Sequence, residues 1–477
     1  MEPVVTSLVD EIRELYVTDS VPWVVGYSGG KDSTATLQLI WLALSELPKS
    51  RLKKPVHVIS TDTLVENPVV AAWVTHSLKT MAEAADSQGL PITPHRLTPE
   101  LHNSFWVNLI GRGYPAPRPM FRWCTERLKI EPSNTFIREV VRDNGETILV
   151  LGTRKAESSK RAATMAKHER HRVRDRLSPN ASLPNSLVYT PIEDWTNDDV
   201  WLFLLEVENP WRWQNDHLLA MYQGATADGE CPLVVDTNTP SCGDSRFGCW
   251  VCTLVDRDRS MHAMIQNDQE KIWMQPLLDL RDDLANRDDR KLRDFRRMNG
   301  SVQLFHGRAI HGPYIQDSRE RWLRQLLAAQ KAVRTSAPPN IAEVELITLE
   351  ELQEIRRIWV VEKHEIEDIL PALYEESTGV PYPGAPLADN SVFGAKEMTE
   401  LKKACGDDRL HFELSRELLD IERKYRGMAR RRGLFDALEG AVRIHYYQDE
   451  SDATDRAQRR RDALDDAEQG KLEGHAR

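Results

Sequence analysis

The chain has 477 residues, of which 40% are hydrophobic and 29% charged, and its formal net charge is −11. The length exceeds one ordinary domain of about 100–200 residues. The acidic balance excludes a coat that binds nucleic acid over its whole surface, so such binding would need a local basic patch. No run of about 18 apolar residues predicts a membrane span, and the first 15 residues predict an amphipathic helix rather than a signal peptide. We expect a cytoplasmic protein without a membrane partner, whose thiols stay reduced.

Residues 22–210 alternate short apolar runs with amphipathic stretches. This alternation is typical of βαβ units and predicts an α/β, Rossmann-like parallel sheet. The alternation stops at 226–256, a segment rich in Cys, Gly, Asp, Thr and Pro. This composition indicates a loop whose structure depends on a group bound to it. The elements we expect are strands at 22–27, 55–60, 91–97 and 147–152, with helices at 33–47 and 68–87.

The chain from about residue 261 is heavily charged and mostly helical in its pattern. A Gly-rich interruption at 299–313 predicts a short hairpin or linker, and a helix restarts at 317–333. Residues 378–392 predict a loop, and the polar tail from about 450 predicts a frayed helix or disorder.

The sharpest local signal is the sequence SGGKDS, which directly follows the first expected strand and precedes a helix. Its two glycines let the backbone turn tightly towards a ligand, and the helix that follows offers free N–H groups to an anion. An aspartate in this loop would need Mg²⁺ or a backbone turn as its partner. The pattern predicts a pyrophosphate cradle at the carboxyl end of a parallel strand, with a Ser-capped turn as the plainer alternative. The cradle residues are Ser28, Gly29, Gly30, Lys31, Asp32 and Ser33.

A second polar cluster, Asp62, Thr63 and Glu66, follows the second expected strand. Because the carboxyl ends of parallel strands meet at one edge of a sheet, these residues would face the same crevice. A solvated loop with a helix cap is the alternative.

These motifs resemble the PP-loop ATP pyrophosphatases of the PAPS-reductase-like family, which cleave ATP between its α and β phosphates. The resemblance covers roughly residues 20–225 and implies an adenine nucleotide α-hydrolase-like fold that binds ATP and Mg²⁺, with the 62–66 cluster beside the nucleotide. We expect Trp195 and Trp201 to pack the last helix on the sheet. The further matching segments are FRWCT at 121–125 with Lys129, LGTR at 151–154 with Glu157, Ser158 and Arg161, and PIEDWT at 191–196 with DVW at 199–201 and NPW at 209–211.

Four of the six cysteines lie within 22 residues, at Cys231, Cys242, Cys249 and Cys252. Four thiolates there can hold a tetrahedral Zn²⁺ or a 4Fe–4S cluster. Spacing alone does not decide between them, although one CxxC pair in place of the two usual in zinc sites favours the cluster.

The GCWVC sequence, the PP-loop and the long helical extension resemble the DndC sulfurtransferases of bacterial DNA phosphorothioation, in which a 4Fe–4S cluster accompanies the PP-loop. The resemblance implies adenylation of a DNA backbone phosphate and replacement of a non-bridging oxygen by sulfur. It also implies DNA, a cysteine desulfurase and other phosphorothioation subunits as partners. An assimilatory PAPS or APS reductase and a tRNA thiolation enzyme are the alternatives. The parts we expect are a nucleotide-binding domain at 1–225, an iron–sulfur loop at 226–260 and a mostly helical region at 261–477.

The catalytic residues we expect are Lys31, Asp32, Arg154 and Cys124. Arg154 follows a strand end and can contact phosphates through its forked guanidinium. With Lys31 it would stabilise the charge that develops as pyrophosphate leaves. Cys124 lies among basic residues in the sequence, which would lower the pKa of its thiol and suit a sulfur carrier; a half-buried pocket residue is the equal alternative.

Residues 154–176 carry nine Lys and Arg against three acids. This basic stripe predicts phosphate contacts that give nucleic-acid affinity without sequence information, with a solvated helix face as the alternative. A second basic run at 423–432 has acidic flanks and would equally suit a partner protein. The stripe residues we expect to contact nucleic acid are Lys155, Lys160, Arg161, Lys167, Arg170 and Arg172.

Overall fold

The computed structural model describes residues 2–174, 176–225, 248–339, 341, 343–387 and 394–474, and they group into two compact units. Unit 1 comprises residues 1–100, 117–285 and 332–344, and unit 2 comprises 101–116, 286–331 and 345–477. None of the helices formed by the described residues is long and apolar enough to cross a lipid bilayer. Most of the expected iron–sulfur loop, 226–247, lies outside these residues, so the three-part division stays a prediction.

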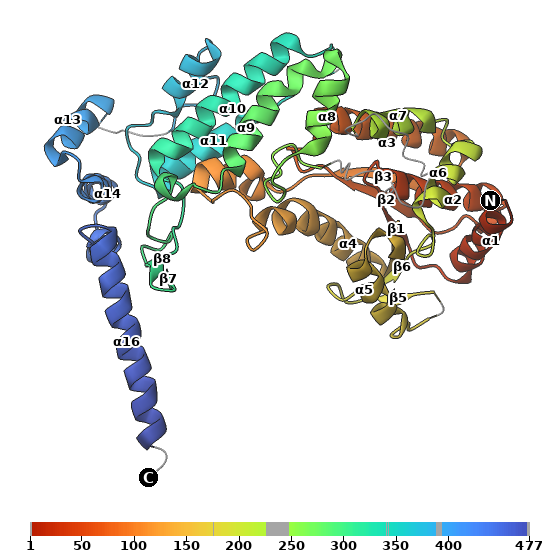
Figure 1. The fold of residues 1–477 in the computed structure, drawn as a ribbon, viewed down its shortest axis with the longest axis horizontal. Coiled ribbons are helices and arrows are strands. Elements are labelled where there is room, and N and C mark those ends of the chain that lie inside the picture. Colours follow the sequence, from red (N-terminus) through yellow and green to blue (C-terminus); the bar gives the residue numbers. More distant parts are fainter. Residues whose placement is uncertain are drawn as a thin grey trace. The chain divides into compact units, whose positions relative to one another are not determined.

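A six-stranded sheet forms the centre of unit 1 and confirms the predicted α/β class (Figure 1). Its strand order is β3-β2-β1-β4-β6-β5, and every neighbouring pair is parallel except β5 with β6. The four expected strands are present within two residues of their predicted ends, whereas β5 and β6 were not predicted. The strands are β1 Trp23–Gly26, β2 Val56–Thr61, β3 Ile92–Leu97, β4 Thr147–Val150, β5 Ser178–Pro179 and β6 Ser186–Tyr189.

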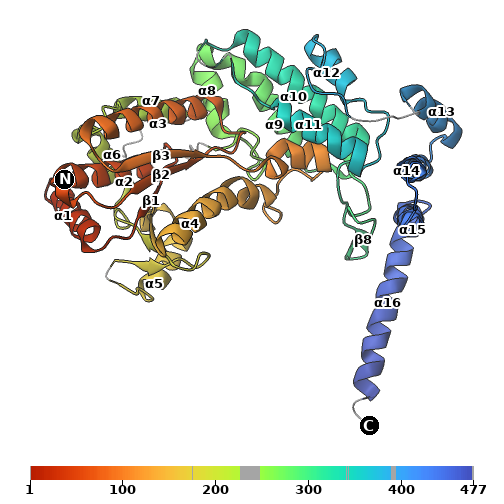
Figure 2. The same ribbon diagram turned by 180° about the vertical axis from the view of Figure 1, so that it is seen from behind.

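Helices cover both faces of this sheet, with α4 on the side opposite α3 and α7 (Figures 1 and 2). Side chains alternate along β1 as a pleated strand requires: Trp23 and Val25 join the larger core, and Val24 packs with Ile137 and Val140 of α4. The helical elements of this unit are α1 Glu2–Thr18, α2 Lys31–Ser45, η1 Lys49–Arg51, α3 Pro68–Gln88, η4 Thr125–Ile130, α4 Glu131–Asn144, η5 Lys155–Glu157, α5 Ser159–Glu169, α6 Asn197–Glu206, α7 Asn215–Gly224, α8 Arg259–Asn267, η6 Gln269–Met274 and α9 Gln275–Ala285.

The PIEDWT segment packs α6 on the sheet, as predicted. Thr196 and Asp199 form a capping box at the start of α6, in which each side chain bonds the backbone of the other. Trp195 and Trp201 are both buried in the larger core. These tryptophans therefore fix the helix rather than contact a ligand.

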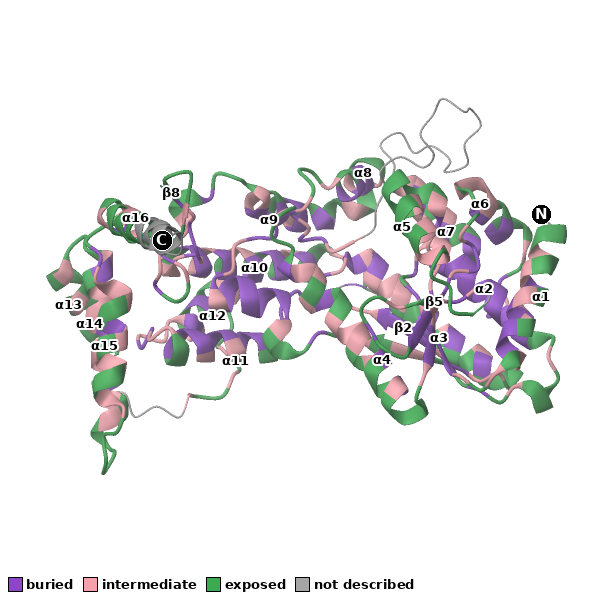
Figure 3. Cartoon of the chain, turned by 90° about the horizontal axis from the view of Figure 1, so that it is seen from below, coloured by how far each residue is buried: buried purple, intermediate pink, exposed green. Residues whose placement is uncertain are grey.

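Unit 2 is mostly helical, in agreement with the sequence pattern. The expected hairpin is present as β7 Leu304–Phe305 and β8 Arg308–Ala309, joined through His306 and Gly307. The buried sides of α10 and α11 stand out in Figure 3, and the tail from residue 450 is helix α16. The helical elements are η2 Leu101–Asn103, η3 Val107–Arg112, η7 Arg290–Leu292, α10 Gln316–Ser336 (which ends in unit 1), α11 Leu349–Arg357, η8 Ile358–Glu362, α12 Leu370–Thr378, α13 Ala395–Cys405, α14 Arg409–Arg426, α15 Leu434–His445 and α16 Glu450–Gly474.

Candidate nucleotide site and adjoining cysteine segment

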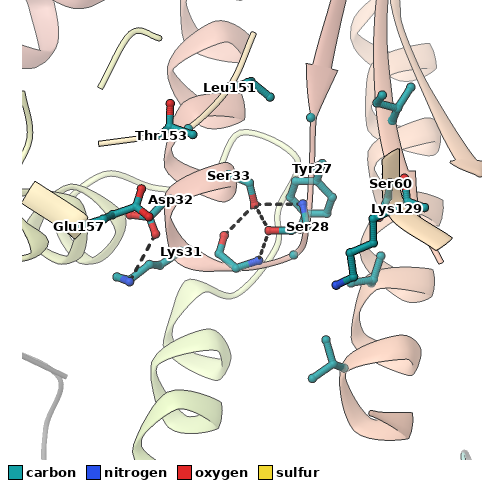
Figure 4. Close-up of a pocket in the computed structure, with 18 of the residues that line it drawn as sticks. Tyr27, Ser28, Lys31, Asp32, Ser33, Ser60, Lys129, Leu151, Thr153 and Glu157 are labelled. Carbon is teal, nitrogen blue, oxygen red and sulfur yellow. Dashed lines mark hydrogen bonds and ion pairs between the residues drawn. The ribbon is translucent and has the colours of Figure 1, made fainter. Parts of the chain in front are cut away.

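The loop at 28–33 is built as a tight turn between β1 and α2 (Figure 4). The Ser33 hydroxyl accepts from the Ser28 backbone N–H at 3.2 Å and donates to the Gly30 carbonyl at 3.0 Å. Gly30 caps α2 without a side chain of its own. The first turn of α2 therefore offers backbone N–H groups to an anion at the carboxyl end of β1.

Two glycines allow this turn to form. Gly29 has a φ of +74°, and an added Cβ would lie 2.5 Å from Cγ2 of Val74. A Cβ on Gly152, which follows β4, would lie 2.7 Å from the Asp32 carbonyl oxygen. The loops after β1 and β4 can approach each other only because both positions lack a side chain.

Three of the predicted catalytic residues meet in one ion cluster. The Asp32 carboxylate lies 3.3 Å from Nζ of Lys31 and accepts from Nε of Arg154 at 2.6 Å. Arg154 is buried and also donates to the Trp195 carbonyl at 3.2 Å. Asp32 thus has two cationic partners, and Lys31 lies 5.4 Å from the ring centre of Tyr222. Cys124 is not part of this cluster.

A cavity of about 1780 Å³ surrounds the loop. This volume exceeds the roughly 300–1,000 Å³ of a pocket for one drug-sized ligand, so a nucleotide would leave space for a second reactant. Its walls come from the ends of β1, β2 and β4, from α3 and α4, and from the 153–161 segment. The predicted residues that line it are Ser28, Gly29, Gly30, Lys31, Asp32, Ser33, Asp62, Glu66, Arg154, Lys160 and Arg161.

Asp62 has an arginine partner that the sequence did not reveal. Nε of Arg96, near the end of β3, donates to the Asp62 carboxylate at 3.0 Å, and Nη1 donates to Thr75 at 3.0 Å. The only sequence signal was an arginine close to the end of an expected strand. With Asp32 and Asp62 both paired to arginines, Mg²⁺ fits this site as a companion of nucleotide phosphates, its usual form of binding, rather than in a cage of carboxylates.

The cysteine segment forms one edge of the same region. Cys249 pairs with Glu66 in an antiparallel bridge, and the Trp250 N–H donates to the Val65 carbonyl at 3.0 Å. The Cys249 thiol lies 3.3 Å from the Thr63 hydroxyl and 3.8 Å from the Glu66 carboxylate. Glu66, predicted as a nucleotide contact, lines the cavity and also touches this cysteine. Thr63, predicted with it, is buried against the cysteine and is not among the described residues that line the cavity.

Cys252 lies one turn beyond Cys249, whose carbonyl accepts from the Cys252 N–H at 3.0 Å. The buried guanidinium of Arg281 donates to the carbonyls of Cys252 and Asp256, both at 2.9 Å, and so fixes the end of this turn. Two thiols on one CxxC turn fit a metal or cluster site. Cys231 and Cys242 lie outside the described residues, and residues that are described contain no group of three or more Cys, His, Asp or Glu placed to hold a metal.

Burial favours the protonated forms of the Cys249 and Cys124 thiols. Burial, and then the charge of Glu66, raises the pKa of Cys249 to about 12. Cys249 in turn raises the pKa of Lys129, whose ammonium lies 3.8 Å from Glu66. Burial also raises the pKa of Cys124, and the nearby Cys252 raises it further. Of the two equal alternatives for Cys124, the depressed pKa of a sulfur carrier is contradicted, because desolvation outweighs the basic neighbours. The thiol is half-buried, as the other alternative expected.

The basic stripe is only partly available to a polyanion. Lys155 bonds Glu169 at 2.6 Å and Asp194 at 2.7 Å, Arg172 bonds Glu193 at 2.9 Å, and Arg161 bonds Glu157 at 2.5 Å. Lys160, Lys167 and Arg170 are exposed and form no ion pair among the residues that the structure describes. Three of the six predicted contacts are thus neutralised within the fold.

Comparisons with known proteins agree with the motifs. Residues 22–212 match the phosphoadenosine phosphosulfate reductase domain family. An uncharacterized protein of Methanocaldococcus jannaschii is 30% identical over 262 residues, which are 55% of this chain and 42% of that protein. The match therefore spans less than half of the curated relative.

Solved structures give weaker matches. The PAPS reductase of Candida auris, in a phosphate complex, aligns over 44% of this chain and 84% of its own at 14% identity, with a TM-score of 0.27. A U34-tRNA thiolase of Methanococcus maripaludis with its 4Fe–4S cluster aligns over 46% of this chain and 71% of its own at 16% identity, with a TM-score of 0.28. Scores this low are no evidence of a common fold.

Proposed function

We propose that this chain, whose residues 22–212 form a PAPS-reductase-like domain, adenylates a backbone phosphate of DNA with ATP and exchanges one non-bridging oxygen for sulfur. One observation carries the proposal: Glu66 and Lys129 line the cavity of the phosphate loop, and Glu66 directly contacts the Cys249 thiol. A thiol that touches a wall residue of the phosphate-loop cavity suits a reaction that first activates an oxygen and then replaces it by sulfur.

In the activation step, the phosphates of ATP bind at the 28–33 loop with Mg²⁺. A non-bridging oxygen of the substrate phosphate attacks the α-phosphorus, the bond to the α–β bridging oxygen breaks, and pyrophosphate leaves with the electron pair. Lys31 and the N–H groups at the start of α2 stabilise the charge on the leaving group. Arg154 positions Asp32, to which it is bonded at 2.6 Å, and so orients the first turn of α2.

In the transfer step, sulfur at the oxidation level of sulfide attacks the phosphorus of the adenylated substrate phosphate. A P–S bond forms, and AMP leaves with the substrate oxygen that had attacked its α-phosphorus. The sulfur would come from a partner cysteine desulfurase, and a thiol reductant would supply two electrons if it arrives as a persulfide. Cys249 and Cys252, with Cys231 and Cys242, would hold a 4Fe–4S cluster, whose chemistry would be to bind the incoming sulfur. Lys129 would balance the charge of the cysteine segment, because it lies 3.8 Å from the Glu66 carboxylate that contacts the Cys249 thiol.

A second candidate is an assimilatory sulfonucleotide reductase, which the matched family favours by its name. That enzyme would bind PAPS or APS in the same cavity and cleave no ATP. A tRNA thiolation enzyme would also cleave ATP, but with RNA as the acceptor.

The test is release of AMP and pyrophosphate from ATP by anaerobically purified protein, with duplex DNA, with tRNA and with neither. The proposal predicts ATP cleavage that duplex DNA stimulates more than tRNA does. Reduction of PAPS with no cleavage of ATP would move the chain to the reductase branch, and stimulation by tRNA alone would move it to tRNA thiolation.

A further inference from the structure

The second basic run, at 423–432, separates into two parts in the structure. Lys424 bonds the buried carboxylate of Asp420 at 2.7 Å, and Arg423 bonds it at 2.5 Å. Asp420 also accepts from His364 at 2.6 Å. These two cations are therefore neutralised within α14 itself, and the bond to His364 joins this cluster to the rest of unit 2.

The remaining arginines are exposed where α14 joins α15: Arg426 is the last residue of α14, and Arg430, Arg431 and Arg432 lie in the turn that follows it. We call residues 426–433 the arginine turn. Within the described part of the chain, none of the four forms an ion pair or a side-chain hydrogen bond. Four unneutralised guanidiniums within seven residues form a dense local positive charge on a chain whose formal net charge is −11.

The backbone of the arginine turn is fixed by the two helices that it joins. These helices pack against each other (Figure 2). The Met428 N–H donates to the Tyr425 carbonyl at 3.2 Å, and the Leu434 N–H donates to the Arg431 carbonyl at 3.3 Å. Gly433 has a φ of +86°, which lets the chain reverse into α15. A fixed turn loses little backbone entropy when it binds a ligand.

Apolar side chains accompany these charges at the surface. Phe435 is 82% exposed and Met428 is 51% exposed. An exposed aromatic ring beside arginines is a combination that binds nucleic acids, since phosphates pair with guanidiniums and bases stack on aromatic rings.

We propose that the arginine turn binds the phosphodiester backbone of a nucleic acid, as a contact in unit 2 separate from the basic stripe of unit 1. The proposal rests on the proposed function for the identity of the polyanion, which is duplex DNA there and tRNA in its alternative. Charge complementarity favours this partner, because a polyanion would be repelled by most of this acidic surface and attracted at the turn.

The test is the triple variant Arg430→Ala, Arg431→Ala, Arg432→Ala, with binding to a fluorescent 30-base-pair DNA and to tRNA measured by anisotropy over a range of salt. We expect affinity to fall about tenfold or more, and the slope of log affinity against log salt to decrease by about 2–3, since each lost phosphate contact removes about 0.9. The matched control is Lys79→Ala, Arg142→Ala, Lys403→Ala, which removes the same charge from exposed cations that already have acidic neighbours. The control should change affinity less than twofold.

An unchanged salt slope in the triple variant, or a wild-type protein that binds neither probe, would overturn the proposal. Loss of binding to an acidic protein subunit with nucleic-acid affinity intact would also overturn it. DNA-independent cleavage of ATP should be equal in wild type, variant and control. If none of the three proteins cleaves ATP, the proposed function is contradicted, and the binding measurements alone decide the role of the arginine turn. If the triple variant loses more affinity for DNA than for tRNA, duplex DNA is the partner.

Discussion

Two ion clusters in this chain have similar components and different surroundings. In unit 1, Asp32 binds Lys31 and Arg154 at the wall of a cavity, and its side chain remains 25% exposed. In unit 2, Asp294 is only 9% exposed and binds Arg296 and Arg409 at 2.7 Å each. The first cluster can exchange a partner for a ligand, whereas the second is closed and can only hold its helices and loops together. The difference teaches that solvent and cavity access, rather than the kind of residue, separates a charged site from a charged core.

The largest expected effect lies in the closed cluster. Arg296→Ala should lower the free energy of unfolding by about 3–5 kcal/mol, because it leaves the buried Asp294 carboxylate with one cation fewer. Urea unfolding measures this loss. The neighbouring Arg297→Ala, which removes only a bond to Gln303, is the control and should cost well under 1 kcal/mol. Equal effects of the two variants would mean that the cluster is not closed.

The open cluster should show the opposite behaviour. Lys31→Ala should reduce ATP cleavage about 10²–10³-fold, the usual result of removing one group that stabilises developing charge. Its thermal unfolding should change little, because the ammonium faces a cavity. Steady-state pyrophosphate release checks this, with Lys79→Ala on the surface of α3 as the control. Full activity in Lys31→Ala would remove this lysine from the mechanism.

Gly29 tests whether the loop itself is shaped for its task. Gly29→Ala should cost about 1–3 kcal/mol, since it places a Cβ at a positive φ and 2.5 Å from Val74. The stabilisation of the protein against heat by ATP should fall with it. Adding Val74→Ala relieves the contact but not the backbone strain, so it should restore only part of the loss. Complete rescue would show that the φ of Gly29 does not matter.

The pH dependence of stability should be a smaller effect of the closed cluster. Burial alone would raise the pKa of Asp294, but the hydrogen bonds and charges of Arg296 and Arg409 outweigh it and lower the pKa well below its usual range. A carboxyl with a depressed folded pKa stabilises the fold above its unfolded pKa of about 3.9, and that stability is lost as pH falls towards the folded pKa. Below about pH 4 the loss should approach about 1.4 kcal/mol per pH unit for this group. Urea titrations from pH 6 to pH 2 should therefore show a shallower slope in Asp294→Asn than in wild type.

Local patterns in the sequence predicted what depends on neighbours in the chain. The SGGKDS loop, the first four strands and the hairpin at 304–309 all follow from adjacent residues. The bridge between Glu66 and Cys249 joins residues far apart in the chain, and no periodic pattern in the sequence predicts it. The pairing of Asp62 with Arg96 was hidden for the same reason.

Charge was the least predictable property, because a cation in the sequence does not show whether it has a partner. Lys155 and Arg172 looked available, yet Glu193 and Asp194 neutralise them. Cys124 looked like an activated thiol, yet burial raises its pKa. Each outcome depends on residues that only folding brings near.

The most direct test of the central claim is to follow sulfur into DNA. The protein would be incubated anaerobically with a cysteine desulfurase, ³⁵S-labelled cysteine, a thiol reductant, ATP and duplex DNA, and the nuclease-digested DNA would be examined for phosphorothioate dinucleotides by mass spectrometry. We predict labelled phosphorothioate with one AMP and one pyrophosphate per sulfur, and none with Lys31→Ala. Cleavage of ATP that leaves the DNA unlabelled while tRNA acquires the label, or reduction of PAPS without use of ATP, would contradict the account.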